Sequence, residues 1–151
     1  MKMISRSILF VSFAALLAVS CKDDDAKPSK TELLTAKSWT ITSFTIGGKD
    51  ASGDYADDCS KDNSTKFSKD GKVTTDNGSV KCDPSESQTE AAGTWAFDSN
   101  ETKLKLTSDG DVETYDIVEL TANTLKISYT ETDTTNGVTV TVKVEITLTG
   151  K

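Results

Sequence analysis

Hydrophobic and polar residues alternate along most of the chain after Trp39, which is the pattern of strands that bury one face. The clearest example surrounds Asn136-Gly137, a dipeptide typical of a two-residue hairpin turn. With that turn, Leu125 faces Leu148, and the next pairs along the two strands alternate between polar and apolar. The pattern therefore predicts a β-hairpin with one buried face.

Three further turns extend this pairing toward the N-terminus, so that each strand lies beside its neighbour in sequence. The turns are expected near residues 121–124, 109–111 and 99–100. The expected facing pairs are Leu120 with Leu125, Val118 with Ile127, Leu106 with Tyr115, Leu104 with Ile117, Trp95 with Leu106 and Phe97 with Leu104. Ile117 and Val118 are adjacent and both apolar, which predicts a β-bulge, and a similar change of parity near Thr42-Ser43 predicts a second one.

Asp70-Gly71 marks another hairpin turn, and its register bears on the two cysteines that flank the hairpin. Centring the hairpin on this turn places Cys59 opposite Cys82, beyond the ends of the two strands. Because two cysteines that face each other in this way suit disulfide geometry, we predict a Cys59–Cys82 bond. The alternatives are two free thiols or a metal-binding pair, but no other soft ligand is near them in the sequence.

Together these patterns predict eight strands behind one helix. The helix is expected over residues 30–36, because Ser29 and Glu32 have the spacing of a capping box. The strands are expected at 38–46, 64–68, 72–77, 92–98, 102–107, 113–120, 124–131 and 138–149. Closure removes the two exposed edges of such a meander, so we expect an all-β fold, an eight-stranded antiparallel up-and-down barrel with a short N-terminal helix. The alternative, an immunoglobulin-like sandwich, requires crossover connections.

Residues 1–20 are typical of a signal peptide. Lys2 and Arg6 precede an apolar run at 8–19, which is shorter than the roughly 20 residues of a membrane-spanning helix. Ser20-Cys21 directly after this run resembles the lipobox of bacterial lipoproteins, whose cysteine is lipidated and becomes the mature N-terminus. The alternative is an ordinary secretory signal followed by a chance cysteine.

An acidic run follows Cys21 at residues 23–25. It makes residues 21–29 a solvated tether between the anchor and the predicted barrel domain, which covers 30–151. The run also resembles the export signal of surface lipoproteins in Bacteroidota. That resemblance implies attachment through Cys21 to the outer face of the outer membrane, with a periplasm-facing attachment as the alternative.

Charge and composition exclude several classes of function. The 151 residues include 17 Lys and Arg, 24 Asp and Glu and no His, for a net charge of −7, which becomes −9 without residues 1–20. An acidic chain is a poor partner for nucleic acid. Without histidine there is no Ser-His-Asp triad and no His-ligated metal site, and no loop has the spaced oxygen ligands of a calcium loop. We expect neither an enzyme nor a metal or cofactor site.

Several short motifs occur in an order that resembles one family. They are Lys37-Ser38-Trp39-Thr40-Ile41, Asp57-Asp58-Cys59, Phe67-Ser68-Lys69-Asp70-Gly71, Cys82-Asp83-Pro84, Gly93-Thr94-Trp95-Ala96-Phe97 and Tyr115-Asp116-Ile117-Val118-Glu119-Leu120-Thr121. Together they resemble the lipocalin-like domain of Bacteroidota lipoproteins over about residues 31–151. Lys37 replaces the usual glycine, and the C-terminal helix of classical lipocalins has no counterpart in the sequence. The resemblance implies a barrel that binds a small ligand, but it names neither the ligand nor a reaction.

Aromatic residues on or near the predicted inner face are the candidates for contacting such a ligand. They are Trp39, Phe67, Trp95, Phe97, Tyr115 and Tyr129. Two interpretations stand side by side: the rings line a ligand cavity, or they fill the barrel as its core. A separate candidate is Asp133-Thr134-Thr135, which resembles an O-glycan acceptor of Bacteroidota.

The expected function follows from the predicted lipoprotein signal and the predicted fold together. We expect a monomeric, lipid-anchored cell-surface protein that binds a small, partly apolar ligand or serves as an accessory in uptake. The alternative is a structural or protein-interaction module with a filled barrel and no ligand.

Overall fold

The computed structural model describes residues 27–55, 59–135 and 137–151. Its elements are α1 (Lys30–Ala36), β1 (Ser38–Ile46), β2 (Lys49–Asp50), α2 (Ser52–Tyr55), β3 (Ser64–Phe67), β4 (Lys72–Asp76), β5 (Thr89–Phe97), β6 (Lys103–Ser108), β7 (Asp111–Leu120), β8 (Thr124–Thr135) and β9 (Val138–Gly150). The predicted signal peptide, Cys21, the acidic run at 23–25, Asp57, Asp58 and Asn136 lie outside the described residues.

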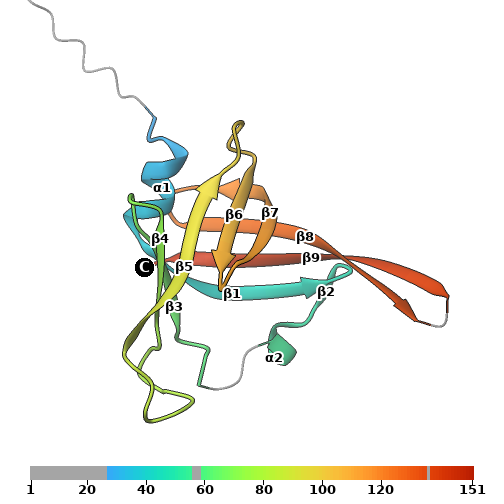
Figure 1. The fold of residues 1–151 in the computed structure, drawn as a ribbon, viewed down its shortest axis with the longest axis horizontal. Coiled ribbons are helices and arrows are strands. Elements are labelled where there is room, and N and C mark those ends of the chain that lie inside the picture. The colour runs from blue at the N-terminus through green and yellow to red at the C-terminus, as the bar shows by residue number, and fades with distance from the viewer. Residues whose placement is uncertain (1–26, 56–58, 136) are drawn as a thin grey trace, which may run out of the picture.

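Eight of these strands close into an antiparallel barrel, which confirms the predicted fold (Figure 1). Strands β3 to β9 pair in sequence order, β1 pairs with β3, and β1 also pairs with β9 to complete the circle. The two-residue strand β2 is an addition that the sequence pattern did not predict, and among the described strands it pairs with the end of β1.

Much of the predicted register is confirmed. Leu125 faces Leu148 in the β8–β9 hairpin, and Trp95 faces Leu106 between β5 and β6. The ladder between β1 and β9 shifts between Ile41 and Ser43, and the ladder between β7 and β8 shifts next to Ile117, so both expected bulges are present. Alternation therefore located the buried face of these strands.

Two hairpin registers differ from the prediction because their turns have other lengths. Leu104 faces Tyr115, and Leu106 faces Glu113, because Asp109 and Gly110 form a two-residue turn in which both have positive φ. That shift of two residues leaves the same side chains on the inner face. The β3–β4 hairpin instead has a three-residue turn that ends at Gly71, and its register differs by one residue, with Phe67 opposite Val73.

Val118 also lies elsewhere than predicted. Ile117 takes the position opposite Ile127, and Val118 is the extra residue of the bulge, with 49% of its surface exposed. A bulge lets only one of two adjacent apolar residues keep the inner face, and here Ile117 keeps it.

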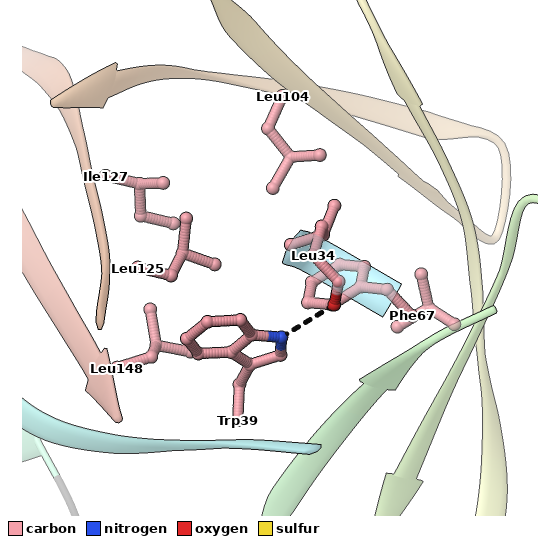
Figure 2. Packing of buried hydrophobic residues seen from close by; sticks show 8 residues of the cluster. Leu34, Trp39, Phe67, Leu104, Leu125, Ile127 and Leu148 are labelled. Atoms are coloured by element: carbon pink, nitrogen blue, oxygen red, sulfur yellow. Dashed lines mark hydrogen bonds between the residues drawn. The ribbon is translucent and has the colours of Figure 1, made fainter. Parts of the chain in front are cut away.

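Helix α1 closes one end of the barrel and completes its core. The Ser29 hydroxyl accepts from the backbone N–H of Glu32 and the Glu32 carboxylate accepts from Ser29, which confirms the capping box. Leu34 projects into the barrel, and the buried Trp39 donates its indole N–H to the Leu34 carbonyl at 2.8 Å (Figure 2). The core residues are Leu34, Trp39, Phe67, Val73, Leu104, Leu125, Ile127 and Leu148. The barrel domain thus encloses its own core.

At the other end of the barrel, β8 and β9 continue beyond their neighbours. The pairing of β7 with β8 reaches Ser128, and the pairing of β1 with β9 reaches Val144. Residues 130–135 and 138–142 therefore form a two-stranded ribbon that projects from the barrel, as Figure 1 shows.

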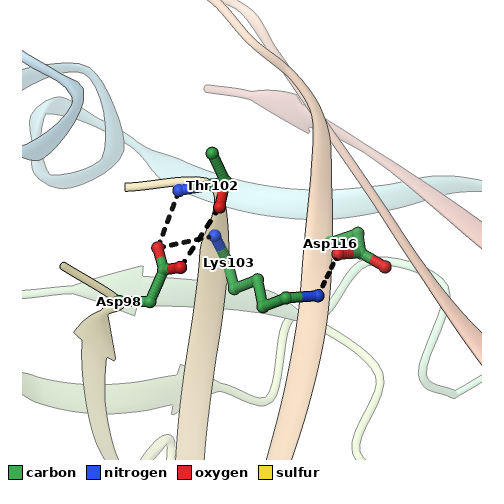
Figure 3. Close-up of polar contacts among 4 residues, drawn as sticks. All are labelled: Asp98, Thr102, Lys103 and Asp116. Atoms are coloured by element: carbon green, nitrogen blue, oxygen red, sulfur yellow. Dashed lines mark hydrogen bonds and ion pairs between the residues drawn. The ribbon is translucent and has the colours of Figure 1, made fainter. Parts of the chain in front are cut away.

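Asp98 fixes the β5–β6 turn at the α1 end. Its carboxylate accepts hydrogen bonds from the backbone N–H groups of Thr102 at 2.7 Å and Lys103 at 3.0 Å, and Lys103 also forms an ion pair with Asp116 on β7 (Figure 3). The hydrogen bond from the Lys103 backbone is the main cause that lowers the pKa of Asp98 below its ordinary value.

This lowered pKa predicts acid sensitivity of the turn. Because the Asp98 carboxyl binds a proton less readily in the folded protein than in the unfolded chain, its charge stabilises the fold above its ordinary pKa of about 4. That stabilisation is lost as the pH falls through the lowered folded-state pKa. We expect the melting temperature to fall as the pH drops below about 4.

The matched variant for this prediction is Asp98→Asn, which keeps an acceptor oxygen but does not titrate. Its melting temperature at neutral pH should be lower than that of the wild-type protein, and its further fall in acid should be smaller. Equal acid sensitivity in the two proteins, followed by circular dichroism, would contradict the role of Asp98.

Candidate functional site

A cavity of about 550 Å³ occupies the end of the barrel remote from α1. This volume lies within the range of roughly 300–1,000 Å³ that small-molecule sites occupy. The lining residues are Trp39, Ile41, Thr42, Ser52, Ser60, Lys61, Asn63, Thr65 and Thr75. The cavity therefore lies on the side of the barrel formed by β1, β3 and β4, while Val144 on β9 is fully buried at the same end.

The apolar part of this lining comes from β1. Trp39 is fully buried and marks the inner end of the cavity, and the half-buried Ile41 lies one pleat further out. Trp39 is paired with Thr65 on β3, and Thr65 with Thr75 on β4, so these three side chains share one row on the inner face. Across β1, β3 and β4 the lining therefore changes from the apolar indole of Trp39 to the hydroxyls of Thr65 and Thr75.

Ser52 at the start of α2 supplies part of the polar rim. The Asp50 carboxylate accepts from the Ser52 hydroxyl at 2.6 Å and from its backbone N–H at 3.0 Å. The same hydroxyl accepts from the backbone N–H of Phe44 at 3.0 Å. The Ser52 hydroxyl is the main cause that lowers the pKa of Asp50. These bonds hold α2 against β1 at the rim of the cavity.

The remaining wall, residues 60–63, is joined to the β4–β5 connection. A disulfide links Cys59 to Cys82 with a Cα–Cα distance of 5.1 Å, as predicted. The Asp62 carboxylate accepts from the Ser79 hydroxyl at 2.6 Å and from its backbone N–H at 2.7 Å. The hydroxyl bond is the main cause that lowers the pKa of Asp62. One covalent bond and two hydrogen bonds thus position this wall.

We predict that removing the disulfide both destabilises the domain and loosens the cavity. Cys59 and Cys82 are 23 residues apart, and closing a loop of that size contributes about 3 kcal/mol in the chain-entropy model. The Cys59→Ala/Cys82→Ala variant should lose about that free energy of unfolding in a denaturant titration. Amide exchange at residues 60–63 should become faster, while α1 keeps its protection. An unchanged midpoint would contradict this assignment.

Comparison with known proteins agrees with this architecture. The sequence matches a family described as a lipocalin-like domain over residues 35–127. The match runs from the last turn of α1 to Ile127 on β8 and covers more than half of the chain. The chain belongs to the lipocalin-like domain family. A comparison with curated proteins found no match.

In this lipocalin-like domain, Trp39 is the one of the six aromatic candidates that lines the cavity. Phe67, Trp95 and Phe97 pack edge-to-face, with ring centroids 6.0 Å and 5.2 Å apart. Tyr115 and Tyr129 form a second edge-to-face pair at 5.6 Å. The structure therefore brings these five rings together in two groups away from the cavity lining.

The polar lining of the lipocalin-like domain was not among the candidates from sequence. A signal for part of it exists, because Thr65 and Thr75 have the same parity as the inward-facing Phe67 and Val73 on their strands. Ser52 at the start of α2 and loop residues such as Ser60 follow no period, so only the tertiary structure reveals them.

Two other features of the lipocalin-like domain concern the surface. A shallow groove of about 390 Å³ lies beside α1, lined by Pro28, Glu32, Leu33, Ala36, Lys37 and Ala122. Within the described ranges, no three His, Cys, Asp or Glu side chains gather as a metal site would require. In that same part of the chain, no helix is long and apolar enough to cross a bilayer.

Proposed function

We propose that this lipocalin-like domain is a lipid-anchored cell-surface protein that binds a small, partly apolar molecule. The observation that carries the proposal is the cavity of about 550 Å³ with an apolar inner end and a polar rim. Binding pockets combine an apolar lining with a few polar groups that fix the orientation of the ligand. A protein of this kind would also suit an accessory role in uptake.

The lining favours an amphiphilic ligand. Its apolar part would enter first and lie against Ile41, above the buried Trp39. Its polar part would remain at the rim, beside the polar side chains of Ser60, Lys61 and Asn63. A molecule with one or two rings and a polar or anionic group at the rim would match both the apolar inner end and the polar rim of the cavity.

The position of the N-terminal segment supports display away from a membrane. The chain reaches α1 at Lys30, at the end of the barrel opposite the cavity. Lys27 is six positions after Cys21, so a fully extended chain would place it at most about 20–22 Å from a lipidated Cys21. An anchor there would hold the α1 end near the membrane and leave the mouth of the cavity facing outward.

A dye titration tests binding at this cavity. We expect saturable binding of 1-anilinonaphthalene-8-sulfonate, whose fused rings and single sulfonate match the lining. Ile41→Trp, which fills the cavity, should weaken binding by about tenfold or more. Lys105→Trp adds the same ring to the exposed outer face of β6 and should leave binding unchanged. Equal binding by both variants would contradict the site.

Two further measurements separate ligand binding from attachment. Native mass spectrometry of protein purified from its host, with organic extraction, should show a bound small molecule; a uniform apo mass together with no dye binding would favour an interaction module. Protease treatment of intact cells should remove the domain, and Cys21→Ser should release it from the membrane. Protection of the wild-type protein would contradict surface exposure without affecting the cavity.

A further inference from the structure

The projecting ribbon, residues 130–135 and 138–142, has two outer edges of different character. The edge of β8 carries Glu131 and Asp133, which oppose pairing with another strand. The edge of β9 runs from Val138 to Val142 with no charged residue and no proline. Within the described ranges, no strand pairs with this part of β9 on the side away from β8. It is an unprotected strand edge.

The hairpin register determines which backbone groups this edge offers. The last pair before the turn is Thr135 with Val138, and next to a two-residue turn such a pair exchanges both of its hydrogen bonds. Val138, Val140 and Val142 therefore direct their backbone groups toward β8. The N–H and C=O groups of Thr139 and Thr141 point outward from the edge.

The two faces of the ribbon are also distinct. Val138 and Val140 lie on one face with 64% and 55% of their surfaces exposed. On the other face, the hydroxyl oxygens of Thr141 and Thr132 are 3.2 Å apart. The edge therefore combines unpaired amides with apolar side chains on a single face, which is what a docking strand requires.

We propose that a second copy of this chain pairs with the outer edge of β9, antiparallel and about a twofold axis through Val140. This register places Thr139 opposite Thr141 of the second copy, so the outward amides of both chains meet. It also places Val138 opposite Val142 of the second copy, so the valines of both chains form one apolar strip, with Glu131 and Asp133 of each β8 on its outer sides. The arrangement is isologous and closes as a dimer.

A second copy fits this edge because the segment is complementary to itself. From residue 138 to residue 142, valine meets valine and threonine meets threonine, so no charged residues face each other. The free edge ends there, because the Lys143 carbonyl already accepts from the backbone N–H of Gly47 at 2.8 Å. Pairing through the β8 edges would instead set Glu131 and Asp133 of the two copies close together. The β9 edge is therefore the favoured contact.

This inference does not depend on a ligand in the cavity, and it departs from the monomer expected from sequence. The ribbon lies beyond residues 35–127, so it is a feature of this chain outside the matched part of the family. The paired segments are short, so the interface is small and the dimer forms in a concentration-dependent way.

Sedimentation velocity from about 5 µM to about 1 mM tests the proposal on residues 22–151, which contain the whole barrel and its core. We expect a monomer–dimer equilibrium. Thr141→Pro removes an outward N–H that the monomer does not use, and should weaken dimerisation at least about tenfold. Thr132→Pro makes the same change directly across the ribbon on the β8 edge and should leave dimerisation within about twofold.

Cross-linking tests the register in folded protein. Val140→Cys should form an intermolecular disulfide rapidly, because the axis places this residue opposite itself at non-hydrogen-bonded spacing. Val138→Cys should cross-link much more slowly. The proposal would be overturned by a monomer throughout the concentration range or by open-ended assembly. It would also be overturned if both proline variants weakened the dimer equally, or if the two cysteine variants cross-linked equally. Circular dichroism confirms that every variant is folded.

Discussion

Replacing Trp39 with alanine is expected to lower the free energy of unfolding by about 3–5 kcal/mol. The Trp39 side chain is fully buried and lies between the core next to α1 and the cavity. Toward α1, its indole N–H bonds the Leu34 carbonyl and fixes the helix that closes the barrel. Toward the other end, it forms the inner limit of the cavity. Its removal would leave a void in the core and an unpaired carbonyl.

Two matched variants separate these contributions in denaturant titrations. Trp39→Phe keeps an aromatic ring but loses the hydrogen bond to Leu34, and should cost less than the alanine variant. Trp95→Ala removes another indole that also donates to a backbone carbonyl, that of Ser68 at 2.9 Å, but this residue is only half-buried. Its cost should be the smaller of the two alanine variants. Equal losses at Trp39 and Trp95 would contradict the central role of Trp39.

The barrel could be predicted from sequence because the signals that define its strands and hairpins are local. Alternating side chains identify the buried face of each strand, and a turn such as that preceding Val138 fixes the register of its hairpin. Near Asp109 the predicted register was wrong by two residues, which preserved the inner face. In the β3–β4 hairpin it was wrong by one residue, which exchanges the two faces of one strand relative to the other. Closure of β1 on β9 followed from the need to remove exposed edges.

The sequence does not show at which residue a strand loses one of its two neighbouring strands. Alternation looks the same in a strand with one partner and in a strand with two, so the ribbon beyond Ser128 and Val144 had no separate signal. The cavity rim was hidden for a related reason. Ser60 and its neighbours reach the cavity through a disulfide and loop hydrogen bonds, which carry no period.

The barrel contains both a packed core and a cavity, whereas the sequence left open whether the inward-facing aromatic residues form one or the other. Leu34 and Trp39 fill the α1 end, where the core gives stability. Toward the other end, the half-buried Thr65 and Thr75 line the cavity instead of joining the core. Half-buried hydroxyls beside a cavity are the polar groups that the proposed function would use to orient a ligand.

Replacing Gly93 with alanine is expected to lower the free energy of unfolding by more than about 4 kcal/mol, at the upper end for a single substitution. Gly93 has φ of 115°, a conformation that residues with side chains rarely adopt. A Cβ atom there would lie 2.0 Å from the Thr107 carbonyl oxygen on β6. The residue follows the bulge between β4 and β5, where β5 approaches β6 closely as the barrel closes.

The control for this prediction is Gly110→Ala in the β6–β7 turn. Gly110 also has a positive φ, of 94°, but a Cβ atom there would meet no atom within 4 Å. It should therefore show only the backbone cost of about 1–2 kcal/mol. The difference between the two variants in urea titrations measures the steric requirement at Gly93. Equal losses would show that strand β6 can move aside, and that barrel closure does not require glycine at this position.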